Sequence, residues 1–159
     1  MSHEGGCLCG DIRFSAEGEP RRTIACHCTF CQRLTGGGAY LVESLYFREN
    51  VTFTGAELKT YTQRSDESGR ALTLQFCDRC GTTLGMQLEW NPRTQTILAG
   101  CFDDPNWVRP ELHLFTRSAR KEVWLPSDAV CYQQHYLLAD GSIDPAVSII
   151  ESDKPWRNP

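Results

Sequence analysis

Cysteine is the residue type best placed to do chemistry in this chain, because seven of its nine cysteines fall in three tight groups. The groups are Cys7 with Cys9, then Cys26 with Cys28 and Cys31, and finally Cys77 with Cys80. Cysteines one or two residues apart form disulfides only with strained geometry, whereas their thiolates can turn toward a shared metal ion. An odd total also cannot pair completely as disulfides. The spacing therefore favours metal binding.

A glycine follows each of the two cysteine pairs, Gly10 after Cys9 and Gly81 after Cys80. A turn that carries two metal ligands commonly needs a residue at positive φ, which glycine adopts without steric cost. The exposed N–H groups of such a turn can donate to thiolate sulfurs. Each pair is thus predicted to form a zinc knuckle, in preference to the alternative that these cysteines are only small buried apolar residues.

The number of clustered cysteines suggests how they are shared between metal ions. A structural zinc takes four protein ligands, whereas a catalytic zinc keeps three and leaves one position open. In the natural partition, the cysteines of the two pairs form one closed site, which comprises Cys7, Cys9, Cys77 and Cys80. The other three cysteines then form a weaker, more exposed site with room for a soft sulfur donor. They are Cys26, Cys28 and Cys31. A partition in which one of these three completes a different set of four remains open. His27 is flanked by two candidate ligands, so we expect a surface position or a supporting role for it.

The remaining two cysteines, Cys101 and Cys131, stand alone in apolar segments, and we expect them to pack in the core. A thiol redox enzyme that used either of them would need an exposed cysteine of low pKa beside a resolving partner. Neither residue has neighbours in sequence that support that role.

Composition restricts the classes of protein and of partner. The 159 residues suit one domain, and 40% hydrophobic residues are enough to build a core. The net charge of −4 offers no general attraction to nucleic acid or anionic lipid, and no apolar stretch is long enough for a membrane helix. The N-terminal residues resemble no secretion signal, so we expect a cytoplasmic protein with reduced thiols.

We expect the domain to span 1–138, with a loosely ordered or docked tail at 139–159.

Period-two alternation and β-branched or aromatic residues predict short strands along most of the domain. These strands are expected at 11–16, 39–47, 50–54, 58–63, 70–76, 82–89, 94–102, 111–116 and 121–125. Glycine, proline and asparagine separate them. Short helices are expected at 29–34 and 127–138. The predicted fold class is therefore all-β, with short helical segments.

Three segments together point to a known family. They are Gly5-Gly6-Cys7-Leu8-Cys9-Gly10, Cys26-His27-Cys28-Thr29-Phe30-Cys31 and Phe76-Cys77-Asp78-Arg79-Cys80-Gly81. In this order they resemble the glutathione-dependent formaldehyde-activating enzyme family, which shares its domain with centromere protein V. The resemblance covers about residues 5–126 and implies a zinc-bound β-tent fold. It also implies the same division of the cysteines into four and three, with a structural zinc and a second zinc at the substrate site.

The family reaction adds the thiol of glutathione to formaldehyde to give S-hydroxymethylglutathione, and its reverse is a carbon–sulfur lyase step. The resemblance therefore implies a small thiol and an aldehyde as partners and two zinc ions per chain, of which the second is expected to be only partly bound. Zinc could ionise the thiol or polarise the aldehyde oxygen. Catalysis would then depend on Cys26, Cys28 and Cys31 through the second zinc.

Other residues are candidates for binding or proton transfer. Arg33, Arg64 and Arg70 could bind the carboxylates of glutathione, and backbone N–H groups around Gly37 could do the same. His113 is a candidate proton shuttle, although a histidine in a strand is more often structural. An alternative of another class is a non-catalytic, zinc-stabilised module that binds glutathione or a protein partner. Nothing in the residues indicates an oligomeric state.

Overall fold

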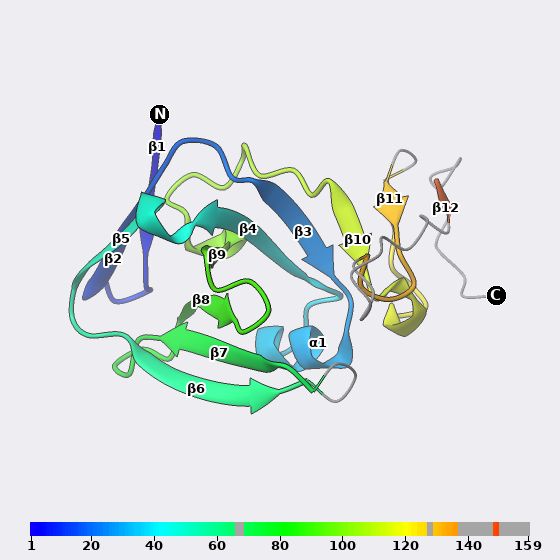
Figure 1. The fold of residues 1–159 in the computed structure, drawn as a ribbon, viewed down its shortest axis with the longest axis horizontal. Helices are drawn as coiled ribbons and strands as arrows, with labels where there is room; N and C mark the ends of the chain where they lie inside the picture. Colours follow the sequence, from blue (N-terminus) through cyan, green and yellow to red (C-terminus); the bar gives the residue numbers. More distant parts are fainter. Residues whose placement is uncertain (66–68, 127–128, 137–147, 150–159) are drawn as a thin grey trace. The chain divides into compact units, whose positions relative to one another are not determined.

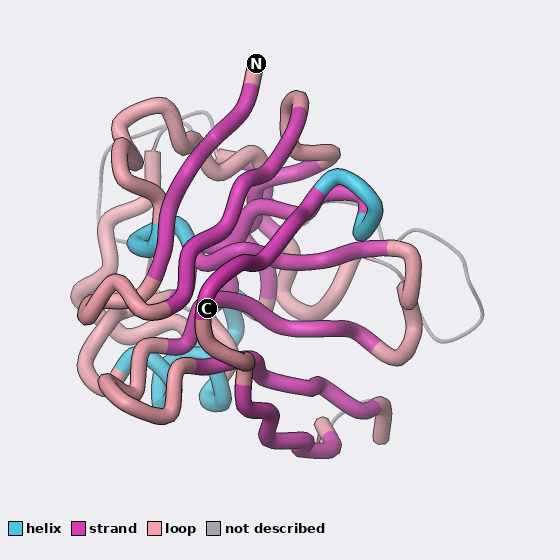
Figure 2. Tube along the Cα trace, turned by 90° about the vertical axis from the view of Figure 1, so that its left-hand side faces the viewer, coloured by secondary structure: helices cyan, strands magenta, loops and turns pink. Residues whose placement is uncertain are grey.

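The computed structural model describes residues 1–65, 69–126, 129–136 and 148–149, and the chain divides into two compact units. Unit 1 comprises Met1–Arg22 and Glu43–Val108, and unit 2 comprises Thr23–Val42 and Arg109–Pro159. Strands predominate throughout, and the helical segments are few and short (Figure 2). The prediction of a mainly β fold is confirmed.

Unit 1 contains a three-stranded antiparallel sheet in the order β1-β2-β5. Its strands are β1 (Ser2–Gly6), β2 (Ile12–Glu17) and β5 (Val51–Gly55). Alternate residues of β2, namely Ile12, Phe14 and Ala16, are almost completely buried, as the period-two pattern predicts. The ring of Phe14 packs edge-on against that of Phe102 at 5.3 Å between centroids. This sheet sets the position of the first cysteine pair, which follows β1 directly.

Five further strands of unit 1 pair antiparallel in the order β4-β9-β8-β7-β6. They are β4 (Leu41–Phe47, with Glu43–Phe47 in this unit), β6 (Lys59–Arg64), β7 (Ala71–Phe76), β8 (Thr83–Leu88) and β9 (Thr94–Leu98). Figure 1 shows β6, β7 and β8 side by side. The register between β7 and β8 shifts between Gln75 and Phe76, immediately before the second cysteine pair. Short 3-10 helices are η1 (Arg48–Asn50) and η2 (Ala99–Cys101).

Unit 2 is built around the strand that leads into the second cysteine group. Its elements are β3 (Arg22–Cys26, from Thr23), α1 (Thr29–Thr35), β10 (Leu112–Leu114), the 3-10 helix η3 (Thr116–Ser118), β11 (Val130–Cys131) and β12 (Ser148–Ile149). Strand β10 pairs parallel with both β3 and β11, and β11 pairs antiparallel with β12. A small core gathers Val123, Leu125, Ala129 and Cys131.

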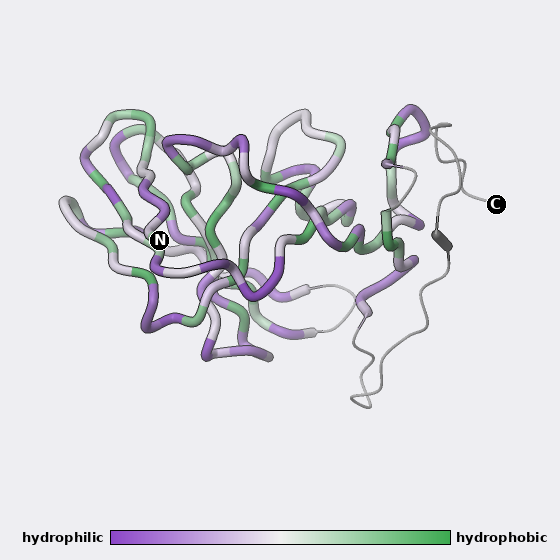
Figure 3. Tube along the Cα trace, turned by 90° about the horizontal axis from the view of Figure 1, so that it is seen from above, coloured by the Kyte–Doolittle hydropathy of each residue, from purple (hydrophilic) through white to green (hydrophobic). Residues whose placement is uncertain are grey.

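Hydrophobic and hydrophilic residues are interleaved along the described chain, and no long apolar segment stands out (Figure 3). In the described ranges, no helix has the length and apolar character that crossing a membrane requires. The longest α-helix there is α1, with seven residues.

Several predicted elements differ from the observed ones. The helix expected at 127–138 is wrong, because within the described residues 129–136 the chain forms β11, where Val130 pairs with Leu112. The strand expected at 121–125 is a turn followed by irregular chain. The strand expected at 94–102 ends at Leu98 and continues as η2. The boundary at 138 and the tail at 139–159 lie outside the described residues, apart from β12, so the predicted domain limits stay predictions.

Candidate metal centres

The four-cysteine cluster of unit 1 brings together Cys7, Cys9, Cys77 and Cys80, whose sulfurs all lie within 4.8 Å of one another. The Sγ atoms of Cys7 and Cys9 are 3.5 Å apart, and those of Cys9 and Cys77 are 3.8 Å apart. Four sulfurs at about 2.3 Å from a tetrahedral zinc would be separated by roughly 3.8 Å. The donor set and its spacing therefore fit a closed tetrahedral metal site.

The two turns of this cluster share their backbone geometry. The N–H of Cys7 donates to the carbonyl of Ile12 at 3.0 Å, and the N–H of Cys77 donates to the carbonyl of Thr82, also at 3.0 Å. Gly10 has a φ of 80° and Gly81 a φ of 73°. This left-handed conformation is the one expected of the glycine after each pair, and it confirms that part of the knuckle prediction.

Hydrogen bonds in and between the turns stabilise negative charge on the sulfurs. The N–H of Ile12 donates to Cys7 Sγ at 3.3 Å. The Thr82 hydroxyl accepts from the Leu8 N–H and lies 3.1 Å from Cys80 Sγ. Hydrogen bonding from Thr82 lowers the pKa of Cys80 to about 5. These contacts favour the thiolate of Cys80, the form that binds a metal. A backbone hydrogen bond from Asp11 lowers the pKa of Cys9, but burial and the neighbouring thiols together raise it to about 12.

A salt bridge links the two knuckle turns. The Nη1 atom of Arg79 lies 2.7 and 2.8 Å from the two carboxylate oxygens of Asp11. Asp11 follows the first cysteine pair, and Arg79 lies within the second. Sequence reasoning missed this link because the two residues are 68 positions apart. The opposite charges therefore help to hold the turns against one another.

The three-cysteine cluster of unit 2 comprises Cys26, Cys28 and Cys31, whose sulfurs also lie within 4.8 Å of one another. Cys26 ends β3, Cys28 caps the N-terminus of α1, and Cys31 lies in the first turn of that helix. The Cys28 sulfur accepts a hydrogen bond from the Cys31 N–H at 3.4 Å. The predicted helix after the second cysteine group is confirmed, and it is the element that brings these thiols together.

The thiols of the three-cysteine cluster do not ionise independently. Hydrogen bonds from Cys26 and Cys31 lower the pKa of Cys28 to about 3. The hydrogen bond with Cys28 contributes most to raising the pKa of Cys26. The hydrogen bond with Cys26 contributes most to raising the pKa of Cys31. Crowded thiolates repel one another, and a divalent cation would remove that penalty. The donor set therefore fits a metal held by three thiolates.

The three-cysteine cluster is no more exposed than the four-cysteine cluster, contrary to expectation. Cys26 and Cys31 are buried, as are Cys7 and Cys77, and the remaining members of both clusters are partly buried. The two sites differ in the number of thiol ligands, four against three. Because of this difference, a metal ion in the three-cysteine cluster would have one coordination position for a further ligand.

His27 and His113 form a buried pair beside the three-cysteine cluster. Their Nε2 and Nδ1 atoms are 3.0 Å apart, and the side chains are 0% and 2% exposed. Burial lowers the pKa of each to about 4, so both rings are neutral near pH 7. The surface position considered for His27 is therefore wrong. Separation in sequence hid this contact, which depends on the parallel pairing of β10 with β3.

The candidate residues for glutathione binding are found in both units. Arg33 is exposed in the last turn of α1, and Gly37 lies just beyond the helix. The Gly37 carbonyl accepts a hydrogen bond from Arg120 Nη1 at 3.2 Å, so the structure adds a cation that sequence reasoning missed. Arg64 and Arg70 belong to unit 1, whereas the three-cysteine cluster belongs to unit 2. The roles of Arg33 and Gly37 stay predictions.

Cys101 and Cys131 are buried, as expected for cysteines that pack in a core. The Cys101 thiol donates to the Thr83 carbonyl at 3.3 Å. Burial raises the pKa of both thiols to about 11. A buried thiol with a raised pKa is a poor nucleophile, so these properties oppose the redox interpretation.

Comparison with known proteins agrees with the cysteine pattern. A family model described as "Glutathione-dependent formaldehyde-activating enzyme" matches residues 2–118. A protein of Halomonas elongata, named "Putative glutathione-dependent formaldehyde-activating enzyme", is 30% identical over 86 residues, which are 53% of this chain and 55% of that protein. The match thus spans about half the length of this relative.

Among solved structures, a crystal structure of a Rhodobacter sphaeroides protein aligns with a TM-score of 0.47 and 18% identity. The alignment covers 63% of this chain and 87% of that one. The family match includes both cysteine clusters and extends over most of the chain. The chain therefore belongs to the glutathione-dependent formaldehyde-activating enzyme family.

Proposed function

We propose that this chain is a zinc-dependent carbon–sulfur lyase that forms or cleaves S-hydroxymethylglutathione, from glutathione and formaldehyde or a related small aldehyde. The observation that carries the proposal is the three-cysteine cluster, which gathers three thiols within 4.8 Å in a member of this family. Three ligands leave an open position, which is typical of a catalytic rather than a structural zinc site.

In this proposal each cluster holds one zinc ion. The structural ion would be held by Cys7, Cys9, Cys77 and Cys80, and the second ion, in a site expected to be only partly filled, by Cys26, Cys28 and Cys31. Zinc bound at the second site would supply either thiol ionisation near neutral pH or Lewis-acid polarisation of the aldehyde. The small thiol and the aldehyde are the expected partners, and nucleic acid is not, since the net charge is −4. A cytoplasmic location would keep the cysteines reduced.

The reaction needs a bond change and a proton transfer that the chain must organise. The thiol sulfur forms a bond to the aldehyde carbon, the carbonyl π bond breaks, and the oxygen takes up the proton that the thiol releases. His113 is the proposed proton carrier, and it contacts His27, which lies between Cys26 and Cys28. The same contact supports a positioning role, in which the pair holds the cysteine segment in place. Arg33 and the N–H groups near Gly37 remain the proposed partners of a glutathione carboxylate.

The test is the exchange of formaldehyde between its free and glutathione-bound forms, followed by NMR. Because uncatalysed addition is readily reversible, the measured quantity is the rate above the buffer background. We expect wild type to accelerate exchange and Cys28→Ser to return it to background, since one ligand of the proposed site is lost. The matched control is Cys101→Ala, which removes a thiol outside both clusters and should retain the rate.

A wild-type rate equal to background would contradict the proposal. If glutathione then still bound, the alternative of a non-catalytic binding module would replace it. Equal loss of rate in Cys28→Ser and Cys101→Ala would instead point to general destabilisation, which melting temperatures measured on the same samples would detect.

A further inference from the structure

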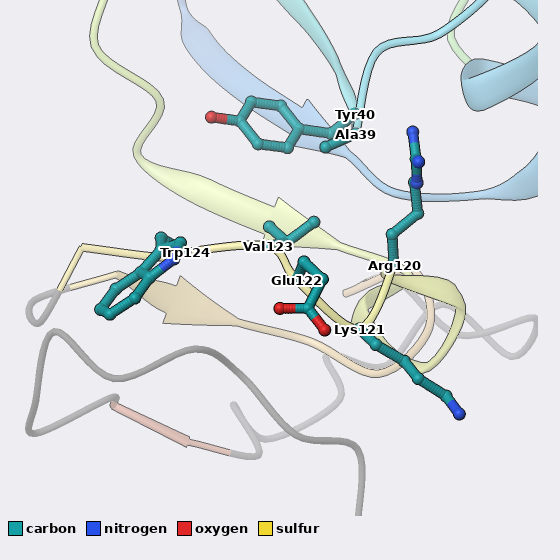
Figure 4. Close-up of a pocket in the computed structure, with 7 residues that line it drawn as sticks. All are labelled: Ala39, Tyr40, Arg120, Lys121, Glu122, Val123 and Trp124. Atoms are coloured by element: carbon teal, nitrogen blue, oxygen red, sulfur yellow. The ribbon is translucent and has the colours of Figure 1, made fainter.

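Unit 2 contains a pocket of about 580 Å³. Its lining comes from Tyr40, which follows the glycine run after α1, and from the segment 120–124 (Figure 4). This volume is in the usual range for a site that binds a small molecule. A strand was expected at 121–125, and the turn and irregular chain found there instead shape the pocket.

The pocket combines an apolar wall with a cation at one side. Tyr40 and Val123 lie on opposite sides of it, with Trp124 toward one end and Arg120 toward the other (Figure 4). Trp124 is 61% exposed, which is unusual for so large an apolar side chain, whereas Val123 is buried. The side chain of Lys121 extends away from Tyr40 and Arg120 (Figure 4). The arrangement resembles a binding site in which an aromatic surface covers a ligand and one charge orients it.

Two contacts of lining residues connect this pocket to the segment that carries the three-cysteine cluster, and Gln32 links that segment to Ser118. The ring of Tyr40 lies 4.8 Å from that of His27, centroid to centroid. Arg120 donates to the Gly37 carbonyl, just beyond the end of α1. The Gln32 side chain on α1 donates to the carbonyls of His27 and Ser118, at 2.7 and 2.8 Å. The pocket therefore adjoins the segment that carries the proposed reaction site, within the same compact unit.

The charged groups of the lining leave capacity for a ligand. A guanidinium has five N–H donors, and the hydrogen bond to Gly37 uses one nitrogen of Arg120. Within the part of the chain that the structure describes, no ion pair involves Glu122, which is exposed at the same pocket. The lining also includes Lys121, so the pocket presents two cations and one carboxylate. Neighbouring charges of opposite sign favour a ligand that carries both charges.

We propose that this pocket binds the zwitterionic amino-acid end of a γ-glutamyl thiol, with its carboxylate on Arg120 and its ammonium near Glu122. The side chains of Tyr40, Val123 and Trp124 would cover the methylene groups. The opposite, glycine end of glutathione carries a carboxylate without an ammonium, so Glu122 would repel it. The identity of the thiol rests on the function proposed above, whereas the charge pattern of the pocket does not.

Binding can be measured without turnover by using S-methylglutathione, which carries both ends of the tripeptide but no thiol. Titration calorimetry on the full chain should give binding that weakens about tenfold in Arg120→Ala and in Glu122→Gln, since each loses a charge-assisted contact. Trp124→Ala should weaken it severalfold through lost apolar contact. Melting temperatures would show that these exposed substitutions leave the fold intact.

The matched control is Arg117→Ala, which removes a positive charge from an exposed residue of η3 outside the pocket lining. Its affinity should stay within about twofold of wild type, because an exposed charge outside the lining contributes little. Equal weakening in Arg117→Ala and Arg120→Ala would mean that only the overall charge matters, and it would overturn the assignment of Arg120. Unchanged affinity in both Arg120→Ala and Glu122→Gln would overturn the pocket itself.

Two shorter probes test which end of the ligand the pocket takes. γ-Glutamyl-S-methylcysteine retains the zwitterionic end and should bind almost as tightly as S-methylglutathione. S-methylcysteinylglycine lacks that end and should bind at least tenfold more weakly. The reverse order would overturn the proposed orientation.

Failure of this inference can be distinguished from failure of the proposed function. If S-methylglutathione bound as described while the exchange rate stayed at background, the pocket would stand and the lyase would not. If exchange were accelerated and the pocket substitutions changed neither KM for glutathione nor affinity for S-methylglutathione, the lyase would stand and the pocket would not.

Discussion

Gly81 closes the second knuckle turn in a left-handed conformation, with a φ of 73°. An alanine there would meet no neighbouring atom within 4 Å, so its effect would come from backbone strain alone. We expect Gly81→Ala to lower the free energy of unfolding by about 1–2 kcal/mol. The matched control is Gly37→Ala, which also has open space but no positive φ, and which should change stability by less than about 0.5 kcal/mol. Chemical denaturation measures both, and equal effects would contradict the strain argument.

Asp103 gives a prediction for the dependence of stability on pH. Hydrogen bonding and charge from Arg13 hold the pKa of this carboxyl below its ordinary value. The folded chain therefore binds this proton less readily than the unfolded chain does. The stabilisation is complete above the unfolded pKa, near 4, and is lost as pH falls through the lower folded pKa.

The measurement is the unfolding free energy of wild type and Asp103→Asn between pH 3 and 6. The difference between them should shrink toward the acid end. The partner variant Arg13→Gln completes a double-mutant cycle and should show the same trend. A difference that is constant across this range would contradict the contribution of the ion pair. Both side chains are about half exposed, so we expect a small effect.

At the scale of single residues, the cysteine groups could be predicted from sequence because metal ligands in one turn must be close in sequence. The glycines after each pair were predictable for the same local reason. The contact between His27 and His113 was not, since it joins residues 86 positions apart. Arg120 was missed because its role depends on the turn that follows it in the chain. The alternating pattern at 121–125 predicts a strand there instead.

At the scale of elements, β10 is the strand that places His113 against the cysteine segment. We expect His113→Ala to destabilise the fold by about 1–3 kcal/mol, because it leaves a cavity and removes the partner of the buried His27 ring. His113→Gln keeps a polar side chain and should recover part of this loss. Thermal melting of the two variants provides the comparison.

The same variants distinguish positioning from proton transfer. If His113 only positions the cysteine segment, the rate should recover with stability in His113→Gln, and its pH profile should match that of wild type. If the rate were lost in both variants while the melting temperature of His113→Gln stayed at the wild-type value, a positioning role would be contradicted and a proton carrier supported.

The strand β2 was predictable because one face of it is buried, so that its sequence alternates with period two. The strands β6 and β9 do not alternate in burial and were predictable from their β-branched and aromatic residues. The strand β1 was missed, since the residues His3, Glu4 and Gly5 carry no such alternation. The strand β3 was missed because four of its five residues are buried, which removes the alternation, and only two of the five are β-branched. The prediction of a helix at 127–138 was wrong because β11 forms there and pairs with β10 and β12. This tertiary pairing cannot be predicted from the local sequence pattern.

At the scale of the whole molecule, the four-cysteine cluster joins the two knuckle turns of unit 1 across 68 residues of sequence. A metal at this site would contribute its binding free energy to folding. We therefore expect Cys77→Ser to lower the melting temperature by at least about 10 °C, which corresponds to roughly 3 kcal/mol or more. The control is Cys101→Ser, a buried cysteine outside both clusters. Unchanged stability in Cys77→Ser with full metal content would refute the structural site.

The central claim is that the clustered cysteines form two separate zinc sites, one structural and one functional. The most direct test is the zinc content per folded chain of wild type, Cys28→Ser and Cys101→Ala, measured by native mass spectrometry with elemental analysis. We expect about two ions in wild type and in Cys101→Ala when the second site is saturated, and about one in a still folded Cys28→Ser. A Cys28→Ser protein that retained two zinc ions, or a zinc-saturated wild type that held fewer than two, would contradict the claim.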